Sequence, residues 1–520
     1  MNKTILELTS EEKNLNKDIT INGWVNTIRL LGKIGFIELR DISGRIQVVI
    51  KDQKILESLK NVTDESCLSF TGELKKKPDD AKKFELVAKD IVIHSIAKDM
   101  PFTNKNIKEI NPTEETIQKY RYLYLRTEKM QKNLLLRSKT TKVIRDFLYE
   151  NGFNEIETPY LGKSTPEGAR DYLVPSRVNR GKFYALPQSP QLYKQILMVS
   201  GMSKYFQVAR CFRDEDLRAD RQPEFTQIDL EMSFIVEEDV IGLLEGMMKR
   251  IWKDIKGINL KVPFPRMKYD EAMKLYGSDK PDLRYEMKFI ARNDEVCFLA
   301  DINKDVLEYL NSQNKVKFAV SGTQLKVYVP KPKKDYIYTP YIELGVARAK
   351  IASILSLNKG EDKFLWVTEF PMFEYSETDK RYVAAHHPFT QPDDITKPIE
   401  EMKSRAYDIV LNGFELGGGS IRIHNEEMQK KILKLLKISD ADAKDNFGFL
   451  LNAFSKGVPP HGGLAIGLDR LVMLLAGADS LREVIAFPKN KNAEGLMEGS
   501  PSNVEKDKLK ELELKGWFCR

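Results

Sequence analysis

Two runs of alternating polar and apolar residues, separated by a charged segment, most constrain how this chain can fold. The runs are Tyr205–Arg213 and Phe225–Phe234, and the segment between them, Asp214–Glu224, is mainly charged. Alternation of this kind is typical of β-strands with one buried face, and a short polar connection makes such strands antiparallel neighbours. The block therefore predicts a hairpin with a charged mouth. Arg213 at that mouth suits a phosphate or a carboxylate, and the alternative is a set of surface ion pairs.

The composition describes a soluble chain of about three domains. At roughly 150 residues per domain, 520 residues exceed a single small fold. No apolar run approaches the roughly 20 residues of a membrane span, and the charged start MNKTILELTSEEKN is unlike a signal peptide. The cysteines lie far apart in sequence, which argues against a disulfide framework and fits the cytoplasm. They are Cys67, Cys211, Cys297 and Cys519.

The first 105 residues predict a small β-barrel. Five strand-like runs are separated by turns that contain glycine, with a short helix between the third and the fourth, which is the order of an OB-fold. Such barrels bind oligonucleotides on an open sheet face, and a generic small barrel is the alternative. The net charge of +7 suits a polyanionic partner without proving one. The runs are Thr20–Ile28, Ile34–Arg40, Arg45–Ile50, Cys67–Lys75 and Phe84–His94, with the helix at Asp52–Leu59.

Residues 106–126 are expected to form a linker, and the remainder is expected to be a larger domain interrupted by an insertion. Asn111 and Pro112 predict a helix start, and a longer helix is expected at Thr127–Asn151, ended by Gly152. Lys-rich and Pro-rich patches mark residues 285–364 as the insertion, which leaves 127–284 and 365–520 as the two parts of the large domain. Within the insertion, Arg348 and Lys350 are expected to lie on a solvated face.

Glycine-rich blocks near the end of the chain predict a phosphate-binding site. Three consecutive glycines in FELGGGSIRIHN (Phe414–Asn425) let a backbone come close to a ligand. Asp408 and Glu415 are candidates for a Mg²⁺ site, because this ion takes one or two carboxylates together with substrate phosphates. GGLAIGLDRLVMLLAG (Gly462–Gly477) predicts a strand that turns into a helix with Arg470 near its positively polarised start, where a cation could meet a polyphosphate.

Taken together, these blocks resemble the signatures of class II aminoacyl-tRNA synthetases, and in finer detail those of the bacterial-type aspartyl-tRNA synthetases. The resemblance spans nearly the whole chain. It implies an α+β protein with an N-terminal OB-fold barrel, an antiparallel-sheet catalytic domain and a small inserted domain. It rests on Gly152–Leu161, Thr165–Arg177, Ala185–Gln195, Phe212–Asp229, Tyr276–Arg284, His386–Thr390, Gly417–His424 and Gly467–Leu471.

The resemblance implies a ligase that joins L-aspartate to tRNA at the expense of ATP. Lys194 and Arg422 would hold the side-chain carboxylate, Glu167 would meet the ammonium group, and Arg213 would bridge the α-carboxylate and the α-phosphate. A pocket built on paired carboxylates rejects a neutral analogue far better than an apolar pocket does. The implied aspartate site comprises Glu167, Ser189, Gln191, Lys194, Arg213, Asp229, His386 and Arg422.

The resemblance also implies an ATP site in which adenine stacks between an aromatic ring and an arginine, here Phe225 and Arg470. Arg213 and Arg470 would be the catalytic cations, and Asp408 and Glu415 would hold Mg²⁺. Aspartate already carries a nucleophilic carboxylate, so the first step needs no general base. The implied ATP contacts are Arg213, Asp214, Glu215, Gln222, Phe225, Glu415, Gly467, Leu468, Asp469 and Arg470.

For tRNA, the resemblance implies anticodon recognition on the barrel by base stacking and base-edge hydrogen bonds. The matching positions are Arg29, Phe36, Gln47 and Glu85, although a strand aromatic such as Phe36 is more often a core residue. Leu31 matches a position that separates tRNA(Asp)-only enzymes from those that also charge tRNA(Asn), and it favours the strict type. The insertion is shorter than is usual for the family. The loop 75–83 is also shortened, which removes the second landmark of this discrimination, so charging of tRNA(Asn) stays open.

A homodimer is implied by Gly152–Leu161, with Pro159 at the centre of the interface. Three other functions stay open: an asparaginyl enzyme of the same subclass, a non-catalytic RNA-binding relative and a free-standing asparagine synthetase. The insertion and the pair Lys194/Arg422 argue against the first, the retained site residues against the second, and the barrel against the third. His94, His424 and His461 are too scattered for a metal cluster and are expected to be structural, and His387 is either a packed neighbour or a ligand.

Overall fold

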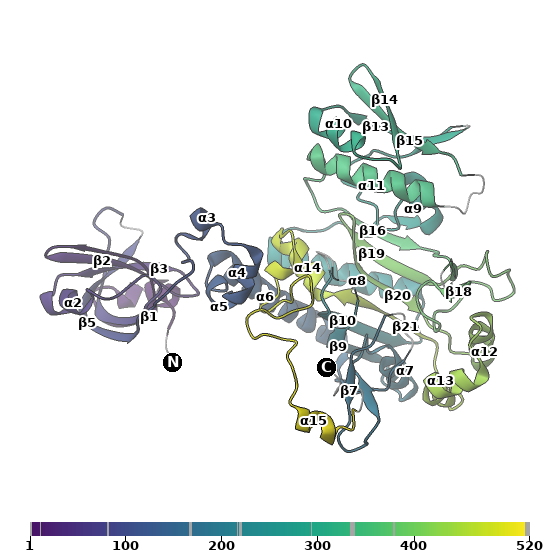
Figure 1. Cartoon of the computed structure of the whole chain (residues 1–520), viewed down its shortest axis with the longest axis horizontal. Helices are drawn as coiled ribbons and strands as arrows, with labels where there is room; N and C mark the ends of the chain where they lie inside the picture. Colours follow the sequence, from purple (N-terminus) through teal and green to yellow (C-terminus); the bar gives the residue numbers. More distant parts are fainter. Residues whose placement is uncertain are drawn as a thin grey trace. The chain divides into compact units, whose positions relative to one another are not determined.

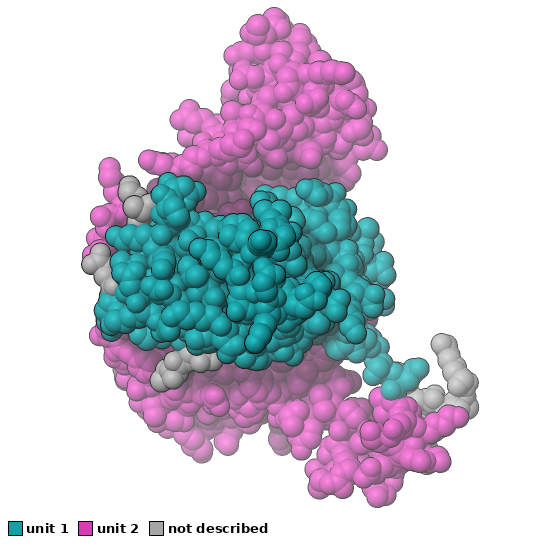
Figure 2. All heavy atoms as spheres, turned by 90° about the vertical axis from the view of Figure 1, so that its left-hand side faces the viewer, with its two compact units in different colours: residues 1–137, 478–503 teal, residues 138–477, 504–520 magenta. Residues whose placement is uncertain are grey.

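The computed structural model describes residues 3–10, 12–80, 83–165, 169–215, 217, 221–292, 294–332, 338–377 and 380–514. The chain divides into two compact units, Met1–Arg137 with Ala478–Asn503, and Ser138–Gly477 with Val504–Arg520 (Figure 2). The segment expected as a linker, 106–126, belongs to the first unit together with the barrel. Over the described residues, no helix is both long and apolar enough to cross a bilayer.

The N-terminal strands close into a five-stranded barrel in the order β1-β2-β3-β5-β4, so the predicted OB-fold is confirmed (Figure 1). Gly72 lies where β4 crosses β5, and a Cβ atom there would come within 2.1 Å of the Val87 carbonyl oxygen, so only glycine allows this approach. Helix α1 (Ile5–Ser10) precedes the barrel and α2 (Gln53–Ser58) follows β3. The strands are β1 (Asp18–Leu31), β2 (Ile34–Arg40), β3 (Arg45–Ile50), β4 (Cys67–Lys76) and β5 (Phe84–Ser95).

Short helices complete the first unit. The expected helix start at Asn111 and Pro112 is wrong in detail: Asn111 ends α3 with φ 45°, and Thr113 caps α4 by accepting a hydrogen bond from the Thr116 backbone N–H at 3.2 Å. Arg121 is buried and donates to backbone carbonyls of the returning segment 482–486. These helices are α3 (Ile107–Ile110), α4 (Glu114–Lys119), α5 (Arg121–Tyr124), η3 (Leu481–Glu483) and the start of α6 (Glu128–Glu150), which the sequence predicted.

An eight-stranded sheet forms the centre of the second unit. All its pairings are antiparallel except β11 with β16 and β6 with β9, and the predicted hairpin is β9 and β10. Helices α7 (Gln191–Val199), α8 (Glu237–Ile251) and α14 (Leu468–Ala476) contact its central strands (Figure 1). In spatial order the strands are β11 (Arg266–Lys268), β16 (Phe364–Thr368), β19 (Ala406–Leu411), β20 (Phe414–Ile421), β21 (His461–Gly467), β10 (Glu224–Ser233), β9 (Lys204–Phe212) and β6 (Asn154–Glu155).

Smaller elements surround this sheet. Two hairpins stand apart from it, and the last described helix, α15, follows the return of the chain from the first unit. The hairpins are β7 (Leu173–Pro175) with β8 (Phe183–Ala185), and β17 (Phe373–Ser376) with β18 (Arg381–Ala384). The remaining helices are η2 (Trp252–Lys256), α9 (Tyr269–Tyr276), α12 (Glu426–Leu435), α13 (Asp440–Phe454) and α15 (Lys506–Glu511).

The insertion folds as a four-stranded sheet, in the order β12-β13-β15-β14, that packs on α11 (Figure 1). Its core is formed by one face of the sheet with α10 and α11, for example Phe298, Val327 and Leu344. Helix α11 also approaches α9 closely, because a Cβ atom at Gly345 would lie 2.5 Å from the Gly277 carbonyl oxygen. The elements are β12 (Ile290–Ala291), β13 (Glu295–Asp301), α10 (Lys304–Asn311), β14 (Lys317–Ser321), β15 (Gln324–Pro330) and α11 (Thr339–Ile354).

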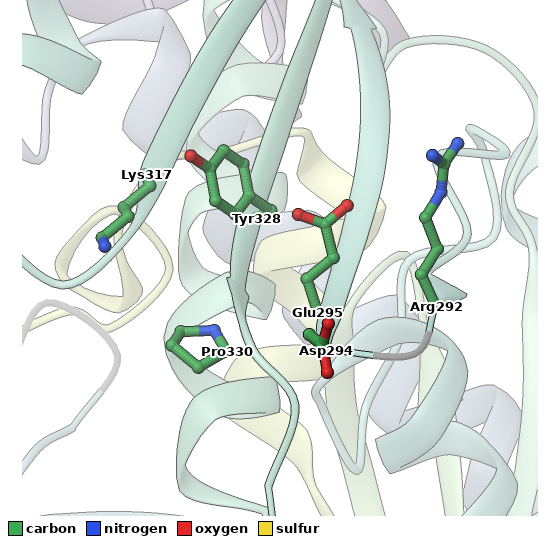
Figure 3. Close-up of a pocket in the computed structure, with 6 residues that line it drawn as sticks. All are labelled: Arg292, Asp294, Glu295, Lys317, Tyr328 and Pro330. Atoms are coloured by element: carbon green, nitrogen blue, oxygen red, sulfur yellow. The ribbon is translucent and has the colours of Figure 1, made fainter.

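The opposite face of this small sheet is hollowed into a cavity of about 600 Å³ (Figure 3). Tyr328 of β15 and Lys317 of β14 line it, and Lys326 lies over the Tyr328 ring at 4.9 Å from its centroid. Lys326 also forms an ion pair with Glu295. Arg292 and Asp294 add one charge of each sign, so the lining has no excess charge that would select an ionic ligand.

Arg348 is buried, so the expectation that it lies on a solvated face is wrong. Its guanidinium donates to the carbonyl oxygens of Met287, Asp282 and Tyr285 at 2.8, 3.0 and 3.0 Å. It also lies over the Tyr285 ring, 4.2 Å from the centroid. Arg348 therefore ties α11 to the segment that leads into the insertion, whereas Lys350 is exposed as expected.

Replacing Arg348 by leucine should destabilise the insertion, because it leaves buried carbonyl oxygens without donors. We expect a loss of roughly 3 kcal/mol in the local opening free energy. Hydrogen exchange of the amides in residues 290–354 measures this opening directly. Lys350→Leu is the matched control on the same helix and should leave the exchange unchanged. Equal protection in the two variants would contradict a tethering role for Arg348.

Candidate active site

The glycine run of β20 allows three strands to pack closely and leaves room for an acid. A Cβ atom at Gly417 or Gly419 would lie 2.2 or 2.1 Å from a carbonyl oxygen of β21. A Cβ atom at Gly418 would instead lie 2.3 Å from Oδ1 of Asp408, its register partner on β19. Gly417 and Gly419 therefore allow β20 to pack closely against β21, and Gly418 makes space for the Asp408 carboxylate.

A buried cluster of four charges spans α7, β10 and the end of β20. Lys194 Nζ donates to Asp229 Oδ1 at 2.7 Å and lies 3.2 Å from Glu231 Oε2. Arg422 donates to the same Glu231 through Nε at 2.9 Å and Nη2 at 3.1 Å. All four side chains are at most 2% exposed. Glu231 therefore bridges Lys194 and Arg422, the two cations that the resemblance assigned to a single substrate carboxylate.

The two carboxylates of this cluster have different electrostatic environments. Burial alone would raise the pKa of Glu231, but Arg422 and Lys194 outweigh it and lower the pKa to about 2. Burial raises the pKa of Asp229, and Lys194 only partly opposes this shift. The Oδ2 atom of Asp229 has no hydrogen-bond partner among the described residues. Glu231 thus holds the cations, whereas Asp229 keeps an oxygen available to a ligand.

Sequence analysis missed Glu231, although a signal for it was present. Asp229 and Glu231 are two residues apart on β10, and residues at that spacing share one face of a strand. An acid two residues after a predicted ligand on a strand therefore belongs to the same site. What the sequence could not show is that Glu231 would accept hydrogen bonds from Arg422, which lies 191 residues later.

Two adjacent histidines border Arg422 and are neutral. Burial and the nearby Arg422 lower the pKa of His386 to about 4 and hold that of His387 well below its usual value. His387 Nε2 lies 2.7 Å from Arg422 Nη1 and accepts its hydrogen bond. His386, which the resemblance selected, instead packs edge-on against Phe370. The structure therefore brings His387 into hydrogen-bonding contact with Arg422, whereas the contact given for His386 is the one with Phe370.

Near the mouth of the β9–β10 hairpin, Arg213 lies over Phe225, with the guanidinium carbon 5.1 Å from the ring centroid. Phe225 was expected to face Arg470 across an adenine ring. Arg470 belongs to α14, and its Nη1 donates to the backbone oxygen of Glu415 at 2.5 Å. Glu215 accepts from Arg221 at 2.8 Å. The mouth is thus lined by stacked and paired charges, and the adenine sandwich stays a prediction.

Other predicted site residues have varied surroundings. Asp469 is buried and its Oδ2 accepts from the Thr226 backbone N–H at 2.8 Å, so this side chain anchors α14 to β10. Asp214 is exposed, and its backbone N–H donates to the Arg170 carbonyl at 3.0 Å. Gln222 is buried, Ser189 is half-buried, and Gly467 and Leu468 begin α14. Glu167, expected to meet the ammonium group, lies outside the described residues.

Asp408 and Glu415 fit a divalent cation. Burial raises the pKa of Asp408 well above its usual value, and the negative charges of Glu415 and Asp279 add to this shift. Carboxylates that repel one another in a buried place gain from a shared cation. Among the described residues, no set of three or more His, Cys, Asp or Glu side chains gathers around a metal position. A cation held here would take its remaining ligands from substrate phosphates and water.

The first unit carries a separate groove of about 590 Å³ on the barrel. Arg29, Phe36 and Gln47 all line it, and Gln47 donates to Glu85 at 3.3 Å, so all four predicted anticodon positions lie on one surface. The Phe36 ring is half-buried rather than in the core. Lys77 Nζ also lines the groove and donates to Gln47 at 3.1 Å. The sequence did not single out Glu38, which also lines the groove.

Comparisons with known families agree with this arrangement. The family described as "tRNA synthetases class II (D, K and N)" matches residues 113–491, and "OB-fold nucleic acid binding domain" matches residues 19–93. The first match covers the whole sheet with its charge cluster. The chain belongs to the class II tRNA synthetases. The second match covers the barrel and its groove.

Curated relatives of this class II synthetase are similar over almost their full length. It is 43% identical to the aspartate–tRNA(Asp/Asn) ligase of Dictyoglomus turgidum, over 97% of this chain and 96% of the relative. It is 44% identical to the aspartate–tRNA ligase of Ruminiclostridium cellulolyticum, over 98% and 97%. The first alignment runs over 578 positions, more than the 520 residues of this chain, so that relative has segments that this synthetase lacks.

Solved structures share the fold. The asparaginyl-tRNA synthetase of Pyrococcus horikoshii superposes with a TM-score of 0.66 at 20% identity, over 94% of this chain and 98% of the other. A structure described as a putative aspartyl-tRNA synthetase from Leishmania major gives 0.65 at 21% identity, over 94% and 93%. Identity at this level supports the class II architecture and does not distinguish the amino acid.

Ionised Glu231 should stabilise the synthetase only above acidic pH. Its pKa is about 2 in the fold against 4.5 ordinarily. The folded pKa is depressed, so the stabilisation of about 3 kcal/mol is complete above pH 4.5 and is lost as the pH falls toward 2. Denaturant unfolding of wild type and Glu231→Gln should therefore differ at neutral pH and converge on acidification.

Glu238→Gln is the matched control for Glu231, because Glu238 pairs with Arg266 on the surface. Its effect should stay within about 1 kcal/mol at any pH. A wild-type advantage over Glu231→Gln that does not shrink below pH 4.5 would contradict the depressed pKa.

Proposed function

We propose that this chain is an aspartate–tRNA ligase, and the bridged cation pair carries the proposal. Glu231 and Asp229 occupy part of the donor capacity of Lys194 and Arg422. Among the described residues, four of the five N–H donors of Arg422 have partners in Glu231, His387 and Ser420, which leaves one donor of Arg422 uncommitted. One N–H of Lys194 is uncommitted in the same way. A carboxylate that enters here would accept a hydrogen bond from each of these two donors.

Aspartate fits this site better than asparagine. A carboxylate offers acceptors to both uncommitted donors, whereas a carboxamide would turn an NH₂ group toward one of them. In a buried place such a mismatch is costly, because a site built for one hydrogen-bonding pattern rejects the other strongly. The neutral histidines beside Arg422 add no further positive charge. The names of the relatives that align over nearly the whole chain support the same amino acid.

The first step is the attack of an α-carboxylate oxygen of aspartate on the α-phosphorus of ATP. A new O–P bond forms, and the bond between the α-phosphorus and the oxygen that links it to the β-phosphate breaks. Pyrophosphate leaves with the electron pair of that bond. Arg213, which already lies beside Phe225 at the hairpin mouth, would hold the α-carboxylate and α-phosphate together and balance the negative charge on the α-phosphate oxygens in the transition state. Mg²⁺ held by Asp408 and Glu415 would neutralise the phosphates.

The rest of the ATP site follows from the same assignment. Arg470 would meet the distal phosphates or the adenine ring from the start of α14, with Gly467, Leu468 and the backbone of Asp469 beside it. Glu215 and Gln222 would contact adenine from the hairpin, near Asp214. Around the amino acid, Ser189, Gln191, Asp229 and His386 would complete the pocket, and Glu167 would face the ammonium group.

In the second step, a hydroxyl of the 3′-terminal ribose of tRNA attacks the aspartyl carbonyl carbon, an ester forms and AMP leaves. The barrel groove supports tRNA as the acceptor, because it combines a half-buried aromatic, Phe36, with the polar groups of Arg29, Gln47 and Glu85. We place the reaction in the cytoplasm, where these tRNAs are charged.

Charging of tRNA(Asn) is the candidate second activity of the same site. The name aspartate–tRNA(Asp/Asn) ligase of several relatives favours it, whereas the resemblance at Leu31 favours tRNA(Asp) alone. Leu31 is 64% exposed at the end of β1, so it is accessible to an RNA. We propose charging of tRNA(Asp) as the main activity.

We further propose a homodimer through the edge of the large sheet. Strand β6 is its last strand, and Pro159, Tyr160 and Leu161 beyond it are exposed. Tyr160 and Leu161 are 44% and 52% exposed, which is unusual for neighbouring large apolar residues and fits a covered surface.

Parallel charging of purified tRNA(Asp) and tRNA(Asn) with labelled aspartate and ATP tests the proposed function. We expect rapid aspartylation of tRNA(Asp), because the site selects aspartate and the groove accepts its anticodon. Arg213→Ala is the control within the site and should lose at least about 10²-fold in rate, as other losses of a charge-stabilising donor do. Charging of neither tRNA with aspartate would overturn the function, and equal charging of both would show the relaxed activity.

A further inference from the structure

A chain of buried hydrogen bonds leads from the start of β21 to the start of α7. His461 Nδ1 lies 2.8 Å from the Pro459 carbonyl oxygen, and its Nε2 lies 3.0 Å from Gln195 Nε2. One turn earlier on the same helix, Gln191 Nε2 donates to Gln195 Oε1 at 3.0 Å. His461 and Gln195 are fully buried and Gln191 is 8% exposed. The chain therefore ends at a residue of the proposed aspartate pocket.

The Pro459 carbonyl determines the direction of every bond in this chain. A carbonyl oxygen only accepts, so His461 must carry its proton on Nδ1. Burial lowers the pKa of His461 although Glu231 and Pro459 oppose the shift, so the ring is neutral and Nε2 is an acceptor. Gln195 must then turn its NH₂ group to His461 and its carbonyl oxygen to Gln191. Gln191 in turn must donate its own NH₂ group.

This order leaves the Gln191 carbonyl oxygen without a hydrogen-bond donor in the described part of the chain. Gln191 lies three residues before Lys194, on the same side of α7. An amide that could rotate freely would present oxygen or nitrogen to a ligand, and only the oxygen attracts an ammonium group. A locked amide removes the unfavourable orientation before the ligand arrives.

We propose that His461 and Gln195 are positioning residues that lock the Gln191 amide with its carbonyl oxygen toward the α-ammonium group of the amino acid. The inference rests on the proposed function, since it names the group of aspartate that Gln191 meets. His461 touches neither substrate nor reacting atoms and acts only through the two glutamines. The sequence had placed it among the structural histidines, and its place in the fold gives it this second role.

Two variants interrupt the chain at different points. His461→Phe removes the acceptor for the Gln195 NH₂ group. Gln195→Met removes both hydrogen-bonding atoms of the amide and keeps a side chain of similar length. Each should raise the KM for aspartate in ATP–pyrophosphate exchange about tenfold, the value of one hydrogen bond to a charged group. The KM for ATP should stay constant and kcat should fall less than about threefold, because the reacting atoms are untouched.

Succinate separates the ammonium contact from the remainder of the pocket, since it carries both carboxylates and no ammonium group. Its inhibition constant should be the same in wild type and in both variants. In a Gln191→Ala background, His461→Phe and Gln195→Met should have no further effect on the aspartate KM, because the residue through which they act is gone. Phe454→Leu is the packing control. It removes the ring that packs edge-on against His461, with the two ring centroids 6.2 Å apart, and leaves the hydrogen bonds in place. It should leave the KM unchanged.

The outcomes are distinct. Wild-type protein without aspartate-dependent exchange would overturn the proposed function and this inference with it. With an active wild type, four results would overturn the inference alone: an unchanged aspartate KM in both variants, effects additive with Gln191→Ala, a succinate constant that rises in parallel, or the same KM increase in Phe454→Leu. Because Gln195→Met preserves the volume of the side chain, it tests the proposal even if His461→Phe does not fold.

Discussion

The buried carboxylate of Glu231 is the interaction on which the rest of the site depends. Lys194 and Arg422 come from different elements and would repel each other in a buried place if nothing lay between them. Glu231 accepts from both, and in doing so it aligns α7 with the end of β20 across β10. The two cations then lie side by side, and each keeps an N–H group that is uncommitted among the described residues. A second carboxylate, carried by the proposed ligand, could accept hydrogen bonds from these groups.

The backbone of the sheet makes this arrangement possible. Close contacts at Gly417 and Gly419 let β20 approach β21, and the space at Gly418 receives Asp408. The ion cluster and the acidic pair Asp408/Glu415 therefore lie on or against one sheet, which puts the proposed amino acid site beside the proposed phosphate site. Activation of an amino acid by ATP needs this adjacency, because its chemistry is positioning and charge balance rather than proton transfer.

Much of the fold could be predicted from local pattern. Alternation predicted the barrel strands and the β9–β10 hairpin, and helical spacing predicted α6. Arg348 shows where such reasoning ends: no periodicity indicates that an arginine will be surrounded by carbonyl oxygens more than sixty residues away. Asn111 shows a smaller limit, because an asparagine can end one helix as readily as begin the next.

The sequence named three members of the charge cluster but not the network that joins them. Lys194, Asp229 and Arg422 came from a resemblance, whereas Glu231 was not singled out, and the contact of His387 with Arg422 became visible only in the fold. The preference of the wild-type protein for aspartate over asparagine tests the cluster most directly. The account predicts a ratio of kcat/KM in ATP–pyrophosphate exchange on the order of 10⁴ in favour of aspartate. A ratio near one, or a preference for asparagine, would contradict it.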